Sequence, residues 1–142
     1  MSKKNEDRMA LIIDHYENPR NYGARDDADV IQKWGNPGCG DIVTIYLNID
    51  NKGIINNVTF EGEGCTLSQA ATSIITDIVI GKTIEEVENM GSNVISDIVG
   101  LEVAMSRPKC ATLGLTSVKM AINEWQRKKK LDIIKQDKSL SK

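Results

Sequence analysis

The sequence predicts an α+β fold, a small antiparallel sheet with helices packed on it. Two segments rich in β-branched residues flank a turn signal in the first half of the chain, a pattern typical of a β-hairpin. From position 66 onward the apolar residues recur at helical spacing instead. Strands followed by a run of helices are characteristic of α+β folds. With 142 residues, 40% of them hydrophobic and 27% charged, one domain with one core is expected.

The first element is predicted to be a helix over Asn5–Tyr16. Its apolar residues recur at i, i+3, i+4 and i+7, which predicts a single buried face: Met9, Ile12, Ile13 and Tyr16. The helix is expected to end before Pro19, because the residue preceding a proline disfavours helical backbone. A short strand is predicted over Val30–Trp34.

The next segments predict the sheet. Ile42–Ile49 and Ile54–Glu61 are expected to be strands joined by the Asp50–Gly53 turn. Glycine-rich loops are expected before the first of these strands and after the second, at Gly35–Gly40 and Gly62–Cys65.

Helices are predicted for the second half of the chain. One begins after Cys65 and ends near Gly81, and Thr83 with Glu86 forms a capping-box pattern for a second. A third is expected over Ser92–Val99. After these, Met105–Cys110 is expected to be a connection.

The last helix is predicted from about Ala111 to Lys130. Its expected core positions are Leu115, Val118, Ile122 and Trp125. We therefore expect one domain over residues 1–130 and a polar, flexible tail over 131–142.

Composition excludes several classes of function. A net charge of −2 argues against a nucleic-acid-binding protein. No apolar run approaches the ~20 residues that span a bilayer, so no membrane association is expected. Three cysteines do not form a disulfide framework, which indicates a reducing compartment and a cytoplasmic location.

The three cysteines share one kind of setting. Cys39 lies between two glycines, Cys65 follows Gly62-Glu63-Gly64, and Cys110 follows Pro108-Lys109. Two of them come at the start of predicted helices, where the partial positive charge of the helix favours the thiolate, which is both nucleophile and metal ligand. A cysteine can also be a small buried hydrophobic residue, but three in such loops favour a metal or sulfur site.

Two polar residues are candidates for the same site. Asp41 is two residues after Cys39, and in extended backbone these side chains point to the same side, so its carboxylate is the best fourth ligand beside three thiolates. Alternatively it caps a turn or lies at the surface. Lys109 adjoins Cys110, where it can hydrogen-bond sulfide, lower a thiol pKa, or be an ordinary surface lysine.

Two further features have plainer interpretations. His15, the only histidine, would suit a Cys/His hydrolase, but a capping or packing role is favoured. The basic run Arg127–Lys130 is expected to be a solvated helix end, with docking to an acidic partner as the alternative.

Four ordered segments resemble the motifs of the IscU/SufU/NifU-type iron–sulfur cluster assembly proteins: Asp14–Gly23, Asn36–Asp41, Gly62–Ala70 and Arg107–Leu113. The likeness extends over roughly residues 8–130. It implies a three-stranded antiparallel sheet and a site of Cys39, Asp41, Cys65 and Cys110 at one exposed end.

The resemblance also implies the chemistry. Such proteins accept persulfide sulfur from a cysteine desulfurase, bind iron, build a [2Fe-2S] cluster and pass it to acceptor or carrier proteins; the site also holds zinc. In the IscU branch the sulfur acceptor corresponds to Cys110, whereas Cys39 is the better candidate in a SufU-like carrier. Lys109 matches the SufU branch, but the short interval from Cys65 to Cys110 matches IscU.

Three interpretations therefore remain. The first is a cluster scaffold, the second a zinc-dependent sulfurtransferase partner of a desulfurase, and the third a structural zinc module. Whether the protein is an enzyme, and whether it is a monomer or a homodimer, stays open at this stage.

Overall fold

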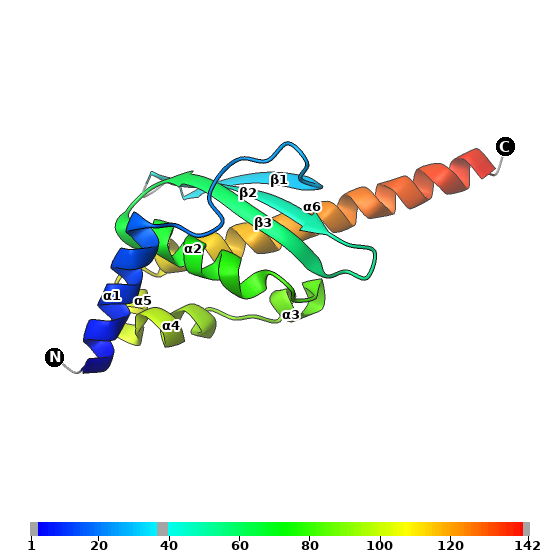
Figure 1. Cartoon of the computed structure of the whole chain (residues 1–142). Helices are drawn as coiled ribbons and strands as arrows, with labels where there is room; N and C mark the ends of the chain where they lie inside the picture. Colours follow the sequence, from blue (N-terminus) through cyan, green and yellow to red (C-terminus); the bar gives the residue numbers. More distant parts are fainter. Residues whose placement is uncertain (1–2, 37–39, 141–142) are drawn as a thin grey trace.

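The computed structural model describes residues 3–36 and 40–140, with side chains described for 5–35 and 40–135. Six helices and three strands lie in these ranges (Figure 1). In chain order they are α1 (Lys3–Glu17), β1 (Val30–Asn36), β2 (Asp41–Ile49), β3 (Ile55–Glu63), α2 (Thr66–Val79), α3 (Ile84–Glu88), α4 (Asn93–Val99), α5 (Leu101–Ser106) and α6 (Pro108–Leu140). The predicted α+β class is confirmed.

The sheet is antiparallel with the order β1-β2-β3. The β2–β3 turn follows the expected sequence signal, since Gly53 adopts a φ of +79° and the Asp50 carboxylate accepts the N–H groups of Lys52 and Ile54. Inward-facing residues alternate along β2, with Val43, Ile45 and Leu47 fully buried. One face of the sheet therefore forms one side of the core.

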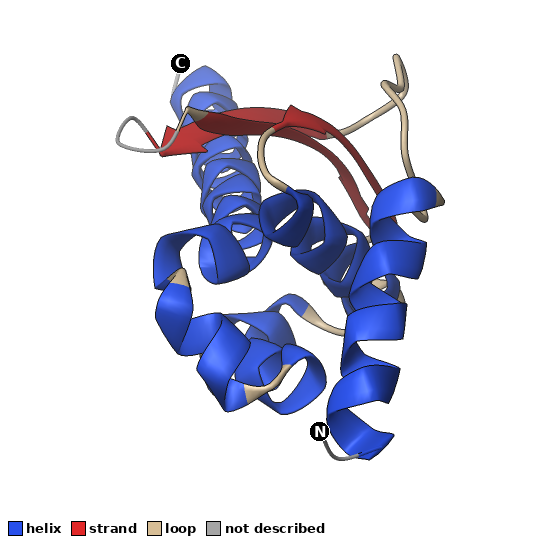
Figure 2. Ribbon diagram, turned by 90° about the vertical axis from the view of Figure 1, so that its left-hand side faces the viewer, coloured by secondary structure: helices blue, strands red, loops and turns tan. Residues whose placement is uncertain are grey.

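Helices cover that buried face of the sheet (Figure 2). α2 and the first half of α6 pack beneath the strands, and Leu115, Val118 and Ile122 are buried as predicted, while Trp125 is partly buried. The capping box of α3 is also present, because Thr83 and Glu86 bond each other's backbone N–H groups. No helix in the described part of the chain is both long and apolar enough to cross a membrane.

The predicted face of α1 is wrong. Met9, Ile13 and Tyr16 are each 46% exposed, and only Ile12 of the four is buried. The buried face instead pairs Ile12 with His15, one turn apart. Hydrophobic spacing did not reveal this face because a polar histidine completes it.

The segment before the third cysteine also differs from expectation. Residues predicted as a connection form the end of α5 and the start of α6. Pro108 is the first residue of α6, a position where proline's missing N–H costs no helical hydrogen bond. α6 continues to Leu140, ten residues past the predicted end; the flexibility of residues 131–142 stays a prediction.

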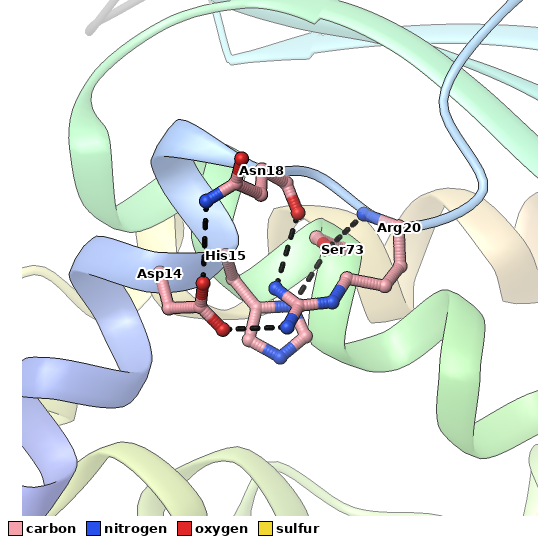
Figure 3. Close-up of polar contacts among 5 residues, drawn as sticks. All are labelled: Asp14, His15, Asn18, Arg20 and Ser73. Carbon is pink, nitrogen blue, oxygen red and sulfur yellow. Dashed lines mark hydrogen bonds and ion pairs between the residues drawn. The ribbon is translucent and has the colours of Figure 1, made fainter.

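Polar residues at the end of α1 and in the segment after it connect that helix to α2 (Figure 3). Ser73 Oγ accepts the Arg20 N–H at 2.8 Å and lies 2.7 Å from His15 Nδ1, while Arg20 forms an ion pair with Asp14. Ser73 Oγ therefore makes two hydrogen bonds, one with the Arg20 backbone and one with the His15 ring. His15 is thus a packing residue, as favoured from the sequence.

Stability should fall as the pH drops through the titration range of His15. Burial lowers the pKa of His15 below 6.5, so in that range the unfolded chain binds more protons than the folded one. Urea unfolding between about pH 7 and about pH 5 is expected to show a steeper loss for the wild type than for His15→Gln. Equal slopes for the two proteins would contradict this role.

Candidate metal centre

Asp41 lies at the centre of the site. It is the first residue of β2 and is only 2% exposed. One carboxylate oxygen, Oδ1, accepts the N–H of Cys65 at 3.0 Å, and the other, Oδ2, accepts the thiol of Cys110 at 3.0 Å. A single carboxylate therefore joins the strand to the starts of two helices.

Cys65 caps the N-terminus of α2. Its backbone is extended, and its Sγ accepts the N–H of Ser68 at 3.4 Å, while the Ser68 hydroxyl donates to the Cys65 carbonyl. Burial opposes ionisation of this half-buried thiol. The hydrogen bonds from Ser68 and Cys110 outweigh that effect and lower the pKa of Cys65.

Cys110 has the opposite environment. It is the third residue of α6 and is 4% exposed. Burial raises the pKa of this thiol, and its hydrogen bonds to Asp41 and Cys65 raise it further. Without a metal, Cys110 is therefore a protonated thiol that donates to Asp41.

Asp41, Cys65 and Cys110 form a compact set of ligand atoms. One carboxylate oxygen and the two sulfurs all lie within 4.8 Å of one another. Ligands on a tetrahedral metal at about 2.0 Å for oxygen and 2.3 Å for sulfur are separated by ~4 Å, so small side-chain rotations would place all three on one ion. The donor set fits zinc or iron.

The set opens to solvent through a pocket of about 400 Å³. Its lining combines Asp41, Cys65 and Cys110 with residues where α5 ends and α6 begins: Ser106, Arg107, Pro108 and Lys109. A small ion or a partner's sulfur-bearing side chain can thus reach the sulfurs from outside.

Of the remaining predicted site residues, Lys109 is exposed and lines the pocket, beside Cys110. Cys39 lies outside the described residues. Its role as a ligand stays a prediction, based on its position two residues before Asp41. His15 bonds Ser73 and is not part of the described metal-ligand set.

Sequence reasoning missed two supporting residues. Ser68 orients Cys65, and Gly64 leaves room for Asp41, since a Cβ on Gly64 would overlap the Asp41 carboxylate and lie 2.6 Å from Ser68 Oγ. Ser68 could have been found from its position three residues after a cysteine that caps a helix. Gly64 could have been found because a glycine often marks a close approach of the backbone to another group.

Cys65 is expected to react faster than Cys110 with iodoacetamide in the reduced, metal-free protein. It is the more exposed of the two and has the lower pKa, and the thiolate is the reacting species. Peptide mass spectrometry should give a rate ratio of about ten or more. In denaturant the two rates should converge, and equal rates in the folded protein would contradict the described site.

Comparison with known proteins identifies relatives over most of the chain. The family model described as "NifU-like N terminal domain" matches residues 8–132. The "Iron-sulfur cluster assembly scaffold protein IscU 1" of Archaeoglobus fulgidus is 35% identical over 127 residues, 88% of this chain and 81% of its own length. The scaffold protein IscU of Escherichia coli is 32% identical over 121 residues, 83% of this chain and 93% of its own.

Solved structures agree with the fold. A putative iron–sulfur cluster assembly scaffold for the SUF system from Fervidobacterium islandicum superposes with a TM-score of 0.67 at 29% identity, covering 79% of this chain and 93% of that one. The N-terminal part of a NifU-like protein from Brucella abortus has a TM-score of 0.72 at 20% identity, covering 87% and 99%. On the extent of these matches, the chain belongs to the NifU-like N-terminal domain family, which includes IscU scaffold proteins.

Proposed function

We propose that this protein is a scaffold on which [2Fe-2S] clusters are assembled before transfer to acceptor proteins. The observation that carries the proposal is the convergence of Asp41, Cys65 and Cys110 in an open pocket. The relatives named as IscU scaffold proteins support it, since they match more than four-fifths of the chain.

In this function the iron ligands are Cys65 and Cys110 together with Cys39 and Asp41. Three thiolates provide soft ligands, and the carboxylate provides a harder one that binds iron less strongly than sulfur does. A weaker fourth ligand favours release of the cluster, which suits a scaffold better than an electron carrier with four thiolates.

The sulfur comes from a cysteine desulfurase, the first partner. Cys110 is the acceptor in the scaffold: its thiol proton passes to the Asp41 carboxylate to which it donates, and its sulfur attacks the terminal sulfur of the donor persulfide. The donor cysteine leaves as a thiolate. Two electrons from a reductant then release the sulfur as sulfide. Lys109, a neighbour of this sulfur site, supplies positive charge at the pocket rim.

The finished cluster passes to acceptor apo-proteins or carrier proteins, the second class of partner. Neither nucleic acid nor a membrane is involved, and the reducing cytoplasm is the location that fits a sequence with three cysteines and no disulfide framework. The protein is then a scaffold rather than an enzyme in the strict sense.

The alternative is a SufU-like sulfurtransferase that holds zinc and takes sulfur on Cys39. Two observations support this alternative function. One solved structural neighbour is described as a scaffold for the SUF system, and a lysine directly precedes the third cysteine. In this case zinc stays bound, and a desulfurase residue displaces one cysteine to free it.

Anaerobic reconstitution separates these functions. The protein is incubated with desulfurase, cysteine, iron and a reductant, and then analysed for metal, acid-labile sulfide and optical absorption. The scaffold predicts equal iron and sulfide with the absorption of a [2Fe-2S] cluster. Retained zinc with sulfur uptake supports the carrier, whereas retained zinc without sulfur uptake refutes both.

Replacing Asp41 with alanine should lengthen the life of the assembled cluster several-fold. The substitution removes the weakest of the four proposed ligands, so ligand exchange with an acceptor or chelator slows. Decay of the cluster absorption after adding a chelator measures the lifetime. Asp26→Ala, an exposed loop carboxylate, is the control and should decay like the wild type. Equal or faster loss in Asp41→Ala would contradict the role of Asp41.

A further inference from the structure

A second pocket lies far from the metal centre, where α6 leaves the body of the protein. It has a volume of about 460 Å³ and is lined by Asn51, Ile84, Trp125, Gln126, Lys129 and Lys130. Trp125 comes fifteen residues after Cys110 on the same helix, which places it about 22 Å from the site. This pocket therefore has no part in metal binding.

The pocket continues along α6 as an apolar and basic stripe. Trp125, Gln126, Lys129, Lys130 and Ile133 follow one another at i, i+1, i+4, i+5 and i+8, so they share one side of the helix. The Lys129 ammonium lies 5.4 Å from the centre of the Trp125 ring, and Ile133 is 57% exposed. We call these five residues the α6 stripe.

The extension of α6 has no partner within the described chain. Every side chain from Arg127 to Lys135 is exposed, and the orange-to-red part of the helix stands clear of the other elements (Figure 1). An isolated helical segment of this length is marginally stable in water. A second surface against the stripe would stabilise it.

The distribution of charge around the pocket indicates which kind of surface could cover the α6 stripe. Residues 123–142 hold seven basic and three acidic side chains, although the whole chain has a net charge of −2, so the first 122 residues carry −6. Directly beside the pocket, α3 presents Glu85 and Glu88, both exposed; Ile84 lines the pocket, and Glu88 is one turn from it on the same side of α3. The apolar centre of this surface is thus Ile84 with Trp125. The exposed glutamates of α3 form an acidic ridge on one side, and Lys129 and Lys130 form a basic ridge on the other.

Such a surface is complementary to itself. A two-fold axis along the apolar centre places the basic ridge of one copy on the acidic ridge of the other and joins the two apolar centres. We propose that the α6 stripe, together with Ile84, Glu85 and Glu88, is the contact face of a homodimer. A separate acidic partner fits less well, because it would also face the glutamates of α3.

Sedimentation velocity tests the proposal, with a reductant and a chelator present so that neither a disulfide nor a shared metal joins two chains. As its concentration is raised to about 0.5 mM, the wild type should change from monomer to dimer. The dimer should dissociate as the salt concentration is raised. The Lys129→Glu, Lys130→Glu variant should be monomeric. The Lys128→Glu, Lys135→Glu variant changes charge equally on another side of the helix and should still dimerise.

A mixing experiment distinguishes ridge-to-ridge pairing from a general effect of charge. The Glu85→Lys, Glu88→Lys variant should also be monomeric alone. Mixed with the Lys129→Glu, Lys130→Glu variant, it should form a heterodimer, because an all-basic face then meets an all-acidic one. Circular dichroism checks that each variant is folded.

A monomeric wild type at all concentrations, or equal dissociation of the stripe and control variants, overturns the proposal. A folded pair of variants that fails to form a heterodimer also overturns it. None of these results depends on cluster assembly at the other end of α6, so the proposed function stands or fails separately.

Discussion

Replacing Gly64 with alanine is expected to weaken metal binding by about 10- to 100-fold while the protein remains folded. The new Cβ would overlap the Asp41 carboxylate and lie 2.6 Å from Ser68 Oγ. Neither group can simply rotate away, because Asp41 is 2% exposed and holds the Cys65 N–H and the Cys110 thiol, and Ser68 is fully buried. The carboxylate or the Cys65 loop must therefore move.

Competition with a chromophoric zinc chelator measures this loss of affinity. Gly91→Ala is the matched control, since its added Cβ would meet only the end of the Asn93 side chain, which can rotate. Gly91→Ala should bind zinc like the wild type. If Gly64→Ala also did so, Asp41 would not belong to the site in the arrangement described.

Replacing Gly114 with alanine is expected to destabilise the fold by about 2–3 kcal/mol. In an exposed helix this change stabilises by about 1 kcal/mol, because glycine has the greater backbone freedom. Here the Cβ would lie 2.7 Å from both Cα and Oγ1 of Thr72, so α6 and α2 would have to separate. The close helix contact at Gly114 therefore outweighs helix propensity.

Chemical denaturation of Gly114→Ala gives the free energy of unfolding directly. Thr116→Ala, an exposed position two residues along α6, is the control and should change stability by less than about 0.5 kcal/mol. Because Cys110 is one turn before Gly114 and Cys65 caps α2, separation of the helices should also weaken metal binding. Unchanged stability in Gly114→Ala would mean that the helices are not in this contact.

Much of the fold followed from local sequence signals. The β2–β3 turn, the strands and the capping box of α3 were predicted because each depends on residues close in the chain, such as Asp50 with Gly53 or Thr83 with Glu86. The buried face of α1 was not, since His15 is buried through its contact with Ser73, 58 residues away. Long-range polar contacts leave no periodic pattern.

The site shows the same division. The residue types and glycine-flanked positions predicted Asp41, Cys65 and Cys110 as candidates, and the structure brings these three together. The different environments of the two thiols could not be predicted, because they depend on which thiol donates to Asp41 and which accepts from Ser68. α5 was missed because a short helix between a glycine and a proline resembles a connection.

The most direct test of the metal centre is X-ray absorption at the zinc edge of the zinc-loaded protein. A site of Cys39, Asp41, Cys65 and Cys110 predicts three sulfur neighbours at about 2.3 Å and one oxygen at about 2.0 Å. Cys110→Ala should lose one sulfur and Asp41→Ala the carboxylate oxygen. A spectrum with no sulfur neighbours, or one unchanged in both variants, would contradict the account.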